Sequence, residues 1–297
     1  MKLQELGENR LLAKLISPLP TNRDVVVGPG DDCAVLRGGA DGRLLLLKTD
    51  CIIEGVHFES DAAPRDVGWK AMARPLSDFA AMSGVPQFAL VTLIAKPETT
   101  LRWTTSLYSG LRKAAGKFGV LIVGGETSST SGPATISVSM VGSAEPDRWV
   151  ARSGGNPGDE LFVTGRLGGS LRGSHLTFMP RIEESRWLTA HFDLHAMMDL
   201  SDGLGADLPR LAHASGVAFE LDEAALPRNR GCNIEQALAD GEDYELLFAV
   251  DPADSAKLQR NWRRKFPRLP LTRIGSLKPL SSKLKRHGLP RGYVHFK

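Results

Sequence analysis

Short apolar runs that lead into an acidic residue recur along this chain. Runs of this length are typical of β-strands, and the longer segments between them carry apolar residues at helical spacing. Strands that alternate with helices predict an α/β or α+β fold, whose ligand sites are usually built by the loops at strand ends. The acidic residues that we expect mostly in such turns are Asp31, Asp32, Asp50, Asp78, Glu126, Asp199, Asp202, Glu242 and Asp243.

A change of composition divides the chain into two parts. Residues 143–158 are rich in Gly, Pro, Ser and isolated charges, as domain boundaries usually are. The length of 297 residues also favours two domains, at roughly 150 residues each. We therefore expect an α/β or α+β sheet domain over residues 1–147 and a second domain over residues 148–297.

Hydrophobic periodicity locates the individual elements. An amphipathic helix is expected over residues 3–16, ended by Pro18 and Pro20. Further helices are expected over 66–82, 100–118, 180–191, 203–215 and 252–266. Strands are expected over 25–27, 44–48, 88–95, 120–123, 133–141, 160–164, 197–200, 217–221 and 244–250.

Composition and charge exclude several classes of protein. With 42% hydrophobic and 24% charged residues, the chain has a globular balance. Its net charge of +3 is too small to indicate a nucleic-acid or membrane partner. No apolar run approaches the ~20 residues that span a bilayer, and residues 1–20 do not resemble a signal peptide, so we expect a cytoplasmic protein. The three cysteines lack C-x-x-C spacing and predict neither disulfides nor a zinc site.

The acidic turns indicate a site for a hard divalent cation if they meet in space. Their like charges would repel one another unless hard cations lay between them, and ligands that offer only oxygen suit Mg²⁺ or Ca²⁺ rather than Zn²⁺. Mg²⁺ keeps several waters and usually completes its shell with phosphate oxygens, so the pattern points to a nucleotide or another phosphorylated ligand. The alternative for each Asp taken singly is a helix N-cap or a turn residue.

Glycines and two further polar residues accompany these acids. The segment 28–30 and the pair Gly124-Gly125 permit close approach of the backbone to phosphate oxygens. Walker A, G-x-G-x-x-G and protein-kinase motifs are absent, which argues against an ordinary P-loop or Rossmann site. Arg152 would either reach a phosphate held by the first domain or be a solvated linker residue. His57 either faces a ligand or is satisfied within its own loop.

Six segments together resemble the thiamine-monophosphate kinases. They occur in that family's order and extend over nearly the whole chain, so the set is far more specific than any one segment. The segments are Gly30-Asp31-Asp32-Cys33-Ala34, Thr49-Asp50 with Gly55-Val56-His57-Phe58, Leu76-Ser77-Asp78-Phe79-Ala80-Ala81-Met82, Arg152-Ser153-Gly154, Asp199-Leu200-Ser201-Asp202-Gly203-Leu204 and Gly241-Glu242-Asp243-Tyr244-Glu245-Leu246.

The resemblance implies a fold and a reaction. The fold is that of the aminoimidazole ribonucleotide synthetase superfamily, with an N-terminal α/β domain that dimerises through its sheet and a C-terminal α+β domain that completes the ATP and substrate cleft. The reaction is direct transfer of the ATP γ-phosphoryl group onto thiamine monophosphate, which gives thiamine diphosphate and ADP. Several Mg²⁺ ions are the implied cofactors, and a homodimer is the implied assembly.

The resemblance also implies roles for individual residues. Gly125, Arg152 and Ser201 would contact ATP, and His57 and Glu242 would contact the thiamine phosphate. Phosphoryl transfer between two anions needs charge neutralisation and positioning, so no covalent nucleophile is expected. The residues that would hold magnesium are Asp32, Thr49, Asp50, Asp78, Glu126, Asp199 and Asp202.

Several residues depart from the family's pattern. Glu126 stands where the family usually has Asp, Lys48 where a small hydroxyl residue is common, and Pro290 where an aromatic residue stacks on thiamine in some members. These departures leave two alternatives open. One is an enzyme with the same ATP and Mg²⁺ cleft but another acceptor, and the other is a catalytically silent nucleotide-binding paralogue.

Overall fold

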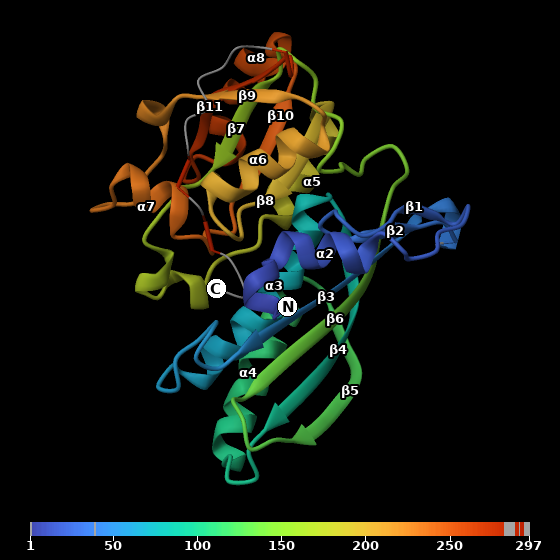
Figure 1. Cartoon of the computed structure of the whole chain (residues 1–297), viewed down its shortest axis with the longest axis vertical. Coiled ribbons are helices and arrows are strands. Elements are labelled where there is room, and N and C mark those ends of the chain that lie inside the picture. Colours follow the sequence, from blue (N-terminus) through green and yellow to red (C-terminus); the bar gives the residue numbers. More distant parts are fainter. Residues whose placement is uncertain (1, 39, 282–288, 291, 294–297) are drawn as a thin grey trace.

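The strands of this chain form two separate sheets. The computed structural model describes residues 2–38, 40–281, 289–290 and 292–293, so the remaining end of the predicted second domain lies outside the described residues. Figure 1 shows one sheet in each half of the molecule. The first sheet ends at Ala144 and the second begins at Glu160, and our boundary near residue 147, which stays a prediction, lies in the segment between them.

The first sheet has six strands, in the order β1-β2-β3-β6-β4-β5. Only the pair β4–β5 is parallel, and β5 is an edge strand. Helices α3 (Pro64–Ala81) and α4 (Leu101–Lys117) bury their apolar residues against one face of this sheet. The strands are β1 (Val25–Val27), β2 (Ala34–Leu36), β3 (Leu44–Ile53), β4 (Val85–Ala95), β5 (Leu121–Ser129) and β6 (Thr135–Ala144).

Two glycines allow α3 and α4 to pack backbone against backbone. A Cβ atom at Gly68 would lie 2.0 Å from the carbonyl oxygen of Leu107, and one at Gly110 would lie 1.8 Å from that of Arg65. Any side chain at these positions would therefore push the helices apart. Thr100 begins α4 as its N-cap, since its hydroxyl accepts a hydrogen bond from the Trp103 N–H.

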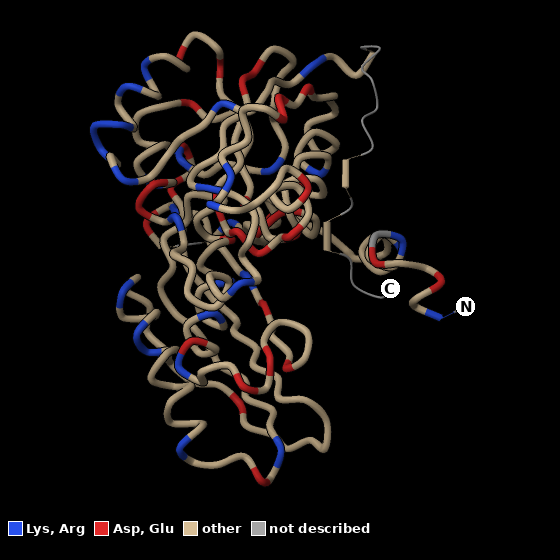
Figure 2. Tube along the Cα trace, turned by 90° about the vertical axis from the view of Figure 1, so that its left-hand side faces the viewer, with Lys and Arg blue, Asp and Glu red and all other residues tan. Residues whose placement is uncertain are grey.

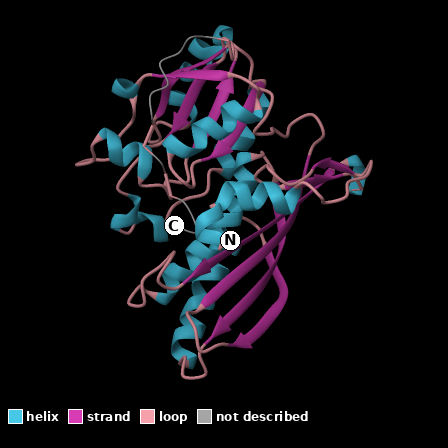
Figure 3. Ribbon diagram, in the orientation of Figure 1, coloured by secondary structure: helices cyan, strands magenta, loops and turns pink. Residues whose placement is uncertain are grey.

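The second sheet has five strands and is antiparallel throughout, in the order β8-β10-β7-β11-β9. One face packs on α6 (Leu204–Ala214) and α7 (Ile234–Ala239), the other on α5 (Ile182–His191) and α8 (Pro252–Lys265). Figure 3 shows helices around the strands of this sheet. All residues of β10 are buried, as expected for a strand covered on both sides. The strands are β7 (Glu160–Thr164), β8 (Leu194–Asp199), β9 (Ala218–Leu221), β10 (Leu246–Val250) and β11 (Leu271–Lys278).

Helix α3 joins the two halves. Ala80, near its end, packs in the core that lies between the second sheet, α5 and α8. Trp69, near its start, donates its indole N–H to the carbonyl oxygen of Phe178 at 2.8 Å. The polar residues of α3 therefore lie where the two halves of the molecule meet.

Most expected elements are present, and the differences have local causes. The single helix expected over residues 3–16 is two helices, α1 (Leu3–Leu6) and α2 (Glu8–Ile16), because Gly7 adopts a φ of 74° between them. The expected turns at Asp50 and Glu126 are wrong, because both residues lie inside strands, paired in register with Val138 and Thr92. The structure also adds β2, β11 and α7, which the periodicity did not predict.

Both halves of the molecule carry basic and acidic residues. Figure 2 shows basic and acidic residues interspersed along both halves. Among the described residues, no helix is both long and apolar enough to cross a membrane. Short 3₁₀ helices lie at Ala40–Gly42, Ser170–Arg172, Ser174–Leu176 and Glu223–Ala225.

Candidate functional site

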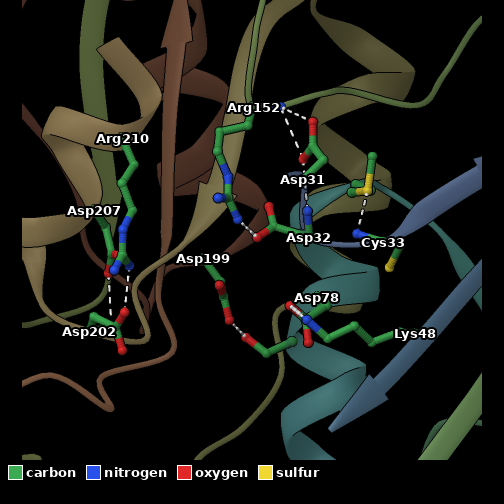
Figure 4. A network of polar contacts seen from close by, with 12 residues as sticks. Asp31, Asp32, Cys33, Lys48, Asp78, Arg152, Asp199, Asp202, Asp207 and Arg210 are labelled. Atoms are coloured by element: carbon green, nitrogen blue, oxygen red, sulfur yellow. Dashed lines mark hydrogen bonds and ion pairs between the residues drawn. The ribbon is translucent and has the colours of Figure 1, made fainter. Parts of the chain in front are cut away.

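Three buried carboxylates meet at the junction of the two halves. Asp32 lies in the loop before β2, Asp78 on α3 and Asp199 at the end of β8. An oxygen atom from each lies within 4.8 Å of the others, and none of the three residues is more than 7% exposed. Figure 4 shows the three side chains turned toward one another. Segments far apart in the sequence thus converge on one acidic centre.

The carboxylates perturb one another's protonation. Burial and the neighbouring charge of Asp32 raise the pKa of Asp199 to about 7. Burial, with the charges of Asp50 and Asp199, likewise raises the pKa of Asp78 well above its usual range, against the opposing effect of Lys48. Folding therefore holds these groups together against their mutual repulsion.

Two basic residues offset part of this charge. The ammonium group of Lys48 lies 2.7 Å from Oδ1 of Asp78, and the guanidinium group of Arg152 forms an ion pair with Asp32. Asp31 accepts a hydrogen bond from the Arg152 backbone N–H at 3.0 Å, so the side chain and backbone of Arg152 both bind the first half. Burial lowers the pKa of Lys48, but Asp78 and Asp50 outweigh this effect and raise it, so Lys48 stays charged at neutral pH.

The cluster fits a hard divalent cation. Its donors are all carboxylate oxygens, the ligand type that Mg²⁺ prefers. The carboxylate of Asp199 accepts a hydrogen bond of 2.5 Å from the Ser77 hydroxyl. Oδ2 of Asp32, by contrast, is buried and has no hydrogen-bond partner. A buried carboxylate oxygen without a partner is costly, and a bound cation would satisfy it.

Asp50 and Asp202 lie outside this group of three and have basic partners of their own. Oδ1 of Asp50 lies 3.7 Å from the Arg74 guanidinium. Burial raises the pKa of Asp50, but Lys48 and Arg74 outweigh it, so the net shift is downward. The carboxylate of Asp202 lies 2.5 Å from the guanidinium group of Arg210. Figure 4 shows this pair apart from Asp32 and Asp78.

A buried aspartate holds the Arg210–Asp202 pair in place. Asp207 lies 2.8 Å from the Arg210 guanidinium and accepts a hydrogen bond of 3.0 Å from the Asp202 backbone N–H. The charges of Asp50 and Asp202, two of the predicted metal ligands outside the group, are therefore already paired.

The other predicted metal ligands contribute less to the cluster. The Thr49 hydroxyl lies 3.0 Å from the hydroxyl of Ser139. Glu126 is exposed on the edge strand β5, and the structure does not bring it into the group of three. A Cβ atom at Gly125 would lie 1.8 Å from the Val91 carbonyl oxygen, so close strand pairing already requires glycine there.

Lys70 links the residues that we expect to contact the acceptor. Its side chain is fully buried, and its ammonium group donates to the His57 carbonyl oxygen at 2.6 Å and to the Glu242 carboxylate at 2.8 Å. Burial outweighs the attraction of Glu242 and lowers the pKa of Lys70 to about 8. The backbone carbonyl oxygen of Ser201, a predicted ATP contact, accepts a hydrogen bond of 2.7 Å from the Glu242 backbone N–H.

Sequence reasoning missed Lys70, Arg74 and Ser77. They share one face of α3 with Asp78, because the four residues stand at positions i, i+4, i+7 and i+8. The rest of this helix is largely apolar and buried. A polar stripe on an otherwise apolar helix was therefore a signal in the sequence that points to the site.

Comparisons with known proteins agree over most of the chain. The N-terminal domain of AIR synthase related proteins matches residues 30–144, and the C-terminal domain of these proteins matches residues 120–275. Thiamine-monophosphate kinase from Rhodopirellula baltica is 38% identical over 91% of this chain and 92% of its own length. The corresponding kinase from Aquifex aeolicus is 33% identical over 100% of both chains.

Solved structures also match this fold. The solved structure of AaThiL complexed with AMPPCP and TMP matches this chain with a TM-score of 0.81. The two sequences are 32% identical, and the match covers 99% of each chain. These findings confirm the expected family and the two-domain α/β and α+β fold.

Removing one charge from the acidic cluster should stabilise the metal-free protein. We expect Asp199→Asn to raise the melting temperature in EDTA at pH 8 by several degrees, since each kcal/mol is worth roughly 2–4 °C in a large domain. Asparagine still offers an oxygen to Ser77, so only the charge is lost. Differential scanning calorimetry measures the shift, with the exposed Asp193→Asn as control. A lower melting temperature for Asp199→Asn would contradict the repulsion.

Proposed function

The chain belongs to the thiamine-monophosphate kinase family, and on that premise we propose that it transfers the γ-phosphoryl group of ATP in line onto thiamine monophosphate, assisted by several Mg²⁺ ions. The observation that carries this proposal is the buried, oxygen-only cluster of Asp32, Asp78 and Asp199. The likeness to AaThiL, which is complexed with AMPPCP, an ATP analogue, and with TMP, supports the pair of substrates.

The carboxylates at the junction would hold the metal. Asp32, Asp78 and Asp199 form its centre, and Asp50 and Asp202 lie outside it with basic partners. Mg²⁺ bound there would neutralise charge on the phosphates and on the oxygens of the transferring group. Lys48 already neutralises part of the charge on Asp78, so we expect the ion to compete with Lys48 for that carboxylate.

Thr49 and Glu126 complete the proposed ligand set. Thr49 is paired with Ser139, and Glu126 is exposed on β5. Mg²⁺ keeps several waters in its shell, and a carboxylate beyond direct reach can bind through one of them.

Arg152 would bind and orient ATP. Its guanidinium group is held at the cluster by Asp32, which raises its pKa against the opposing effect of burial. A permanently charged group already in place costs no reorganisation when negative charge shifts during transfer. Gly125 and Ser201 would supply the remaining contacts to the nucleotide.

His57 and Glu242 would contact the thiamine phosphate. They come from different halves of the molecule, and Lys70 fixes their relative positions by binding both. The acceptor oxygen of a phosphate is already ionised at neutral pH, so transfer needs no general base. The chain's own contribution is therefore to bring two anions into line and to hold them there.

The exposed face of the first sheet supports a homodimer. Leu121 and Val123 on β5 are 62% and 58% exposed, and Phe88 and Leu90 beside them on β4 are 44% and 48% exposed. An apolar patch on an unpaired edge strand is typical of a protein–protein interface. A second copy of this chain, bound through this sheet, would cover it.

The proposed reaction is tested by direct product analysis. Purified protein with ATP, thiamine monophosphate and excess Mg²⁺ should form thiamine diphosphate and ADP in equal amounts, measured by chromatography. Asp50→Asn should reduce kcat by at least about 100-fold because it weakens the metal site.

The exposed Asp61→Asn is the matched control and should leave kcat unchanged. Near-normal turnover by Asp50→Asn would contradict the proposed role of Asp50 as a metal ligand. Bound ATP without formation of thiamine diphosphate would contradict the proposal that thiamine monophosphate is the acceptor.

A charge in the apolar patch should prevent dimerisation. We expect wild-type protein to be a dimer in sedimentation velocity and Val123→Glu to be a monomer, because pairing would bury the new carboxylate. Leu101→Glu places the same charge at a residue that is 78% exposed at the start of α4, and it should stay dimeric. A monomeric wild type, or a dimeric Val123→Glu, would refute the interface.

A further inference from the structure

An open pocket of about 480 Å³ lies in the second half of the molecule and is rich in arginine. Its walls come from the turns that follow β7, from the loop before α7, from the segment between α7 and β10 and from the turn between α8 and β11. Five arginines from these separate segments line it: Arg166, Arg172, Arg181, Arg230 and Arg268.

The carboxylates in the pocket are already neutralised. Glu245 is paired with Arg181, and Glu242 is paired with Lys70. Burial raises the pKa of Asp243 to about 8, although it accepts hydrogen bonds of 3.0 and 3.1 Å from the Gly168 N–H. Asp243 is therefore mostly protonated at neutral pH.

The other four arginines have no acidic partner in the part of the chain that the structure describes. Within the described residues, none of Arg166, Arg172, Arg230 and Arg268 lies within 4.0 Å of a carboxylate. Arg166 and Arg172 donate only to backbone carbonyl oxygens, at 3.3 and 3.5 Å. Four unpaired guanidinium groups around one cavity form a positive site.

The loops that carry these arginines are fixed to one another. Leu167 donates its N–H to the Pro227 carbonyl oxygen at 2.7 Å and accepts a bond of 3.0 Å from the Asn229 N–H. Gly165 donates to the Pro270 carbonyl oxygen at 2.9 Å, and the Trp262 indole donates to that of Leu269 at 2.7 Å. The backbone of the pocket is therefore formed before any ligand binds.

We propose that this pocket is an anion site, separate from the metal cluster, which takes a small molecule bearing a diphosphate group. Guanidinium groups match phosphate oxygens in charge and in bidentate geometry. Several of them converging from different loops suit an anion with more than one phosphate.

Binding of diphosphates without metal tests this site. Isothermal titration calorimetry of the full chain in EDTA uses inorganic pyrophosphate in one arm and ADP in the other. Without divalent cations, the acidic cluster repels both ligands, so binding reports the arginine pocket. We expect one pyrophosphate per chain, with an affinity at least about tenfold weaker in Arg230→Ala/Arg268→Ala. Arg260→Ala/Arg263→Ala, on the exposed side of α8, is the matched control and should bind as wild type does.

The outcomes separate this proposal from the kinase activity, because no turnover is measured. ADP binding that the double variant weakens would identify the ligand as a nucleotide, whereas binding of pyrophosphate alone would identify a free diphosphate. No pyrophosphate binding by the wild type would overturn the proposal, and so would equal binding by both double variants.

Discussion

Repulsion among three buried carboxylates is the constraint on which the rest of the structure depends. Asp32, Asp78 and Asp199 come from both halves of the chain and gain nothing by approaching one another. The apolar cores of the two halves hold them together, with Lys48 and Arg152 offsetting part of the charge. Part of the stability of the fold is therefore spent on assembling a site whose natural complement is a cation.

Helix α3 converts that constraint into a functional arrangement. Its apolar residues pack on the first sheet and in the core between the second sheet, α5 and α8. Lys70, Arg74 and Asp78 form a polar stripe on the same helix where the two halves meet. Asp78 belongs to the metal cluster, and Lys70 binds both predicted acceptor contacts. A single helix thus sets the distance between the proposed metal and the proposed acceptor, which in-line transfer requires.

The sequence predicted which helices and strands form better than it predicted where some of the strands end. Helices α3, α4 and α8 and strand β7 lie within two residues of their expected ranges, because their periodicity is strong and local. Asp50 and Glu126 were wrongly placed in turns, since the end of a strand depends on partner strands that the sequence does not show. Lys70 was missed because its role depends on Glu242, which is 172 positions away in the chain. The roles of the individual site residues stay predictions.

The location of bound metal tests this account most directly. Crystals grown with AMPPCP and with Mn²⁺ in place of Mg²⁺ would give anomalous peaks at each metal position. The account predicts at least one peak coordinated by carboxylate oxygens of Asp32, Asp78 and Asp199. Nucleotide bound with no peak at these residues, or with every peak elsewhere, would contradict it.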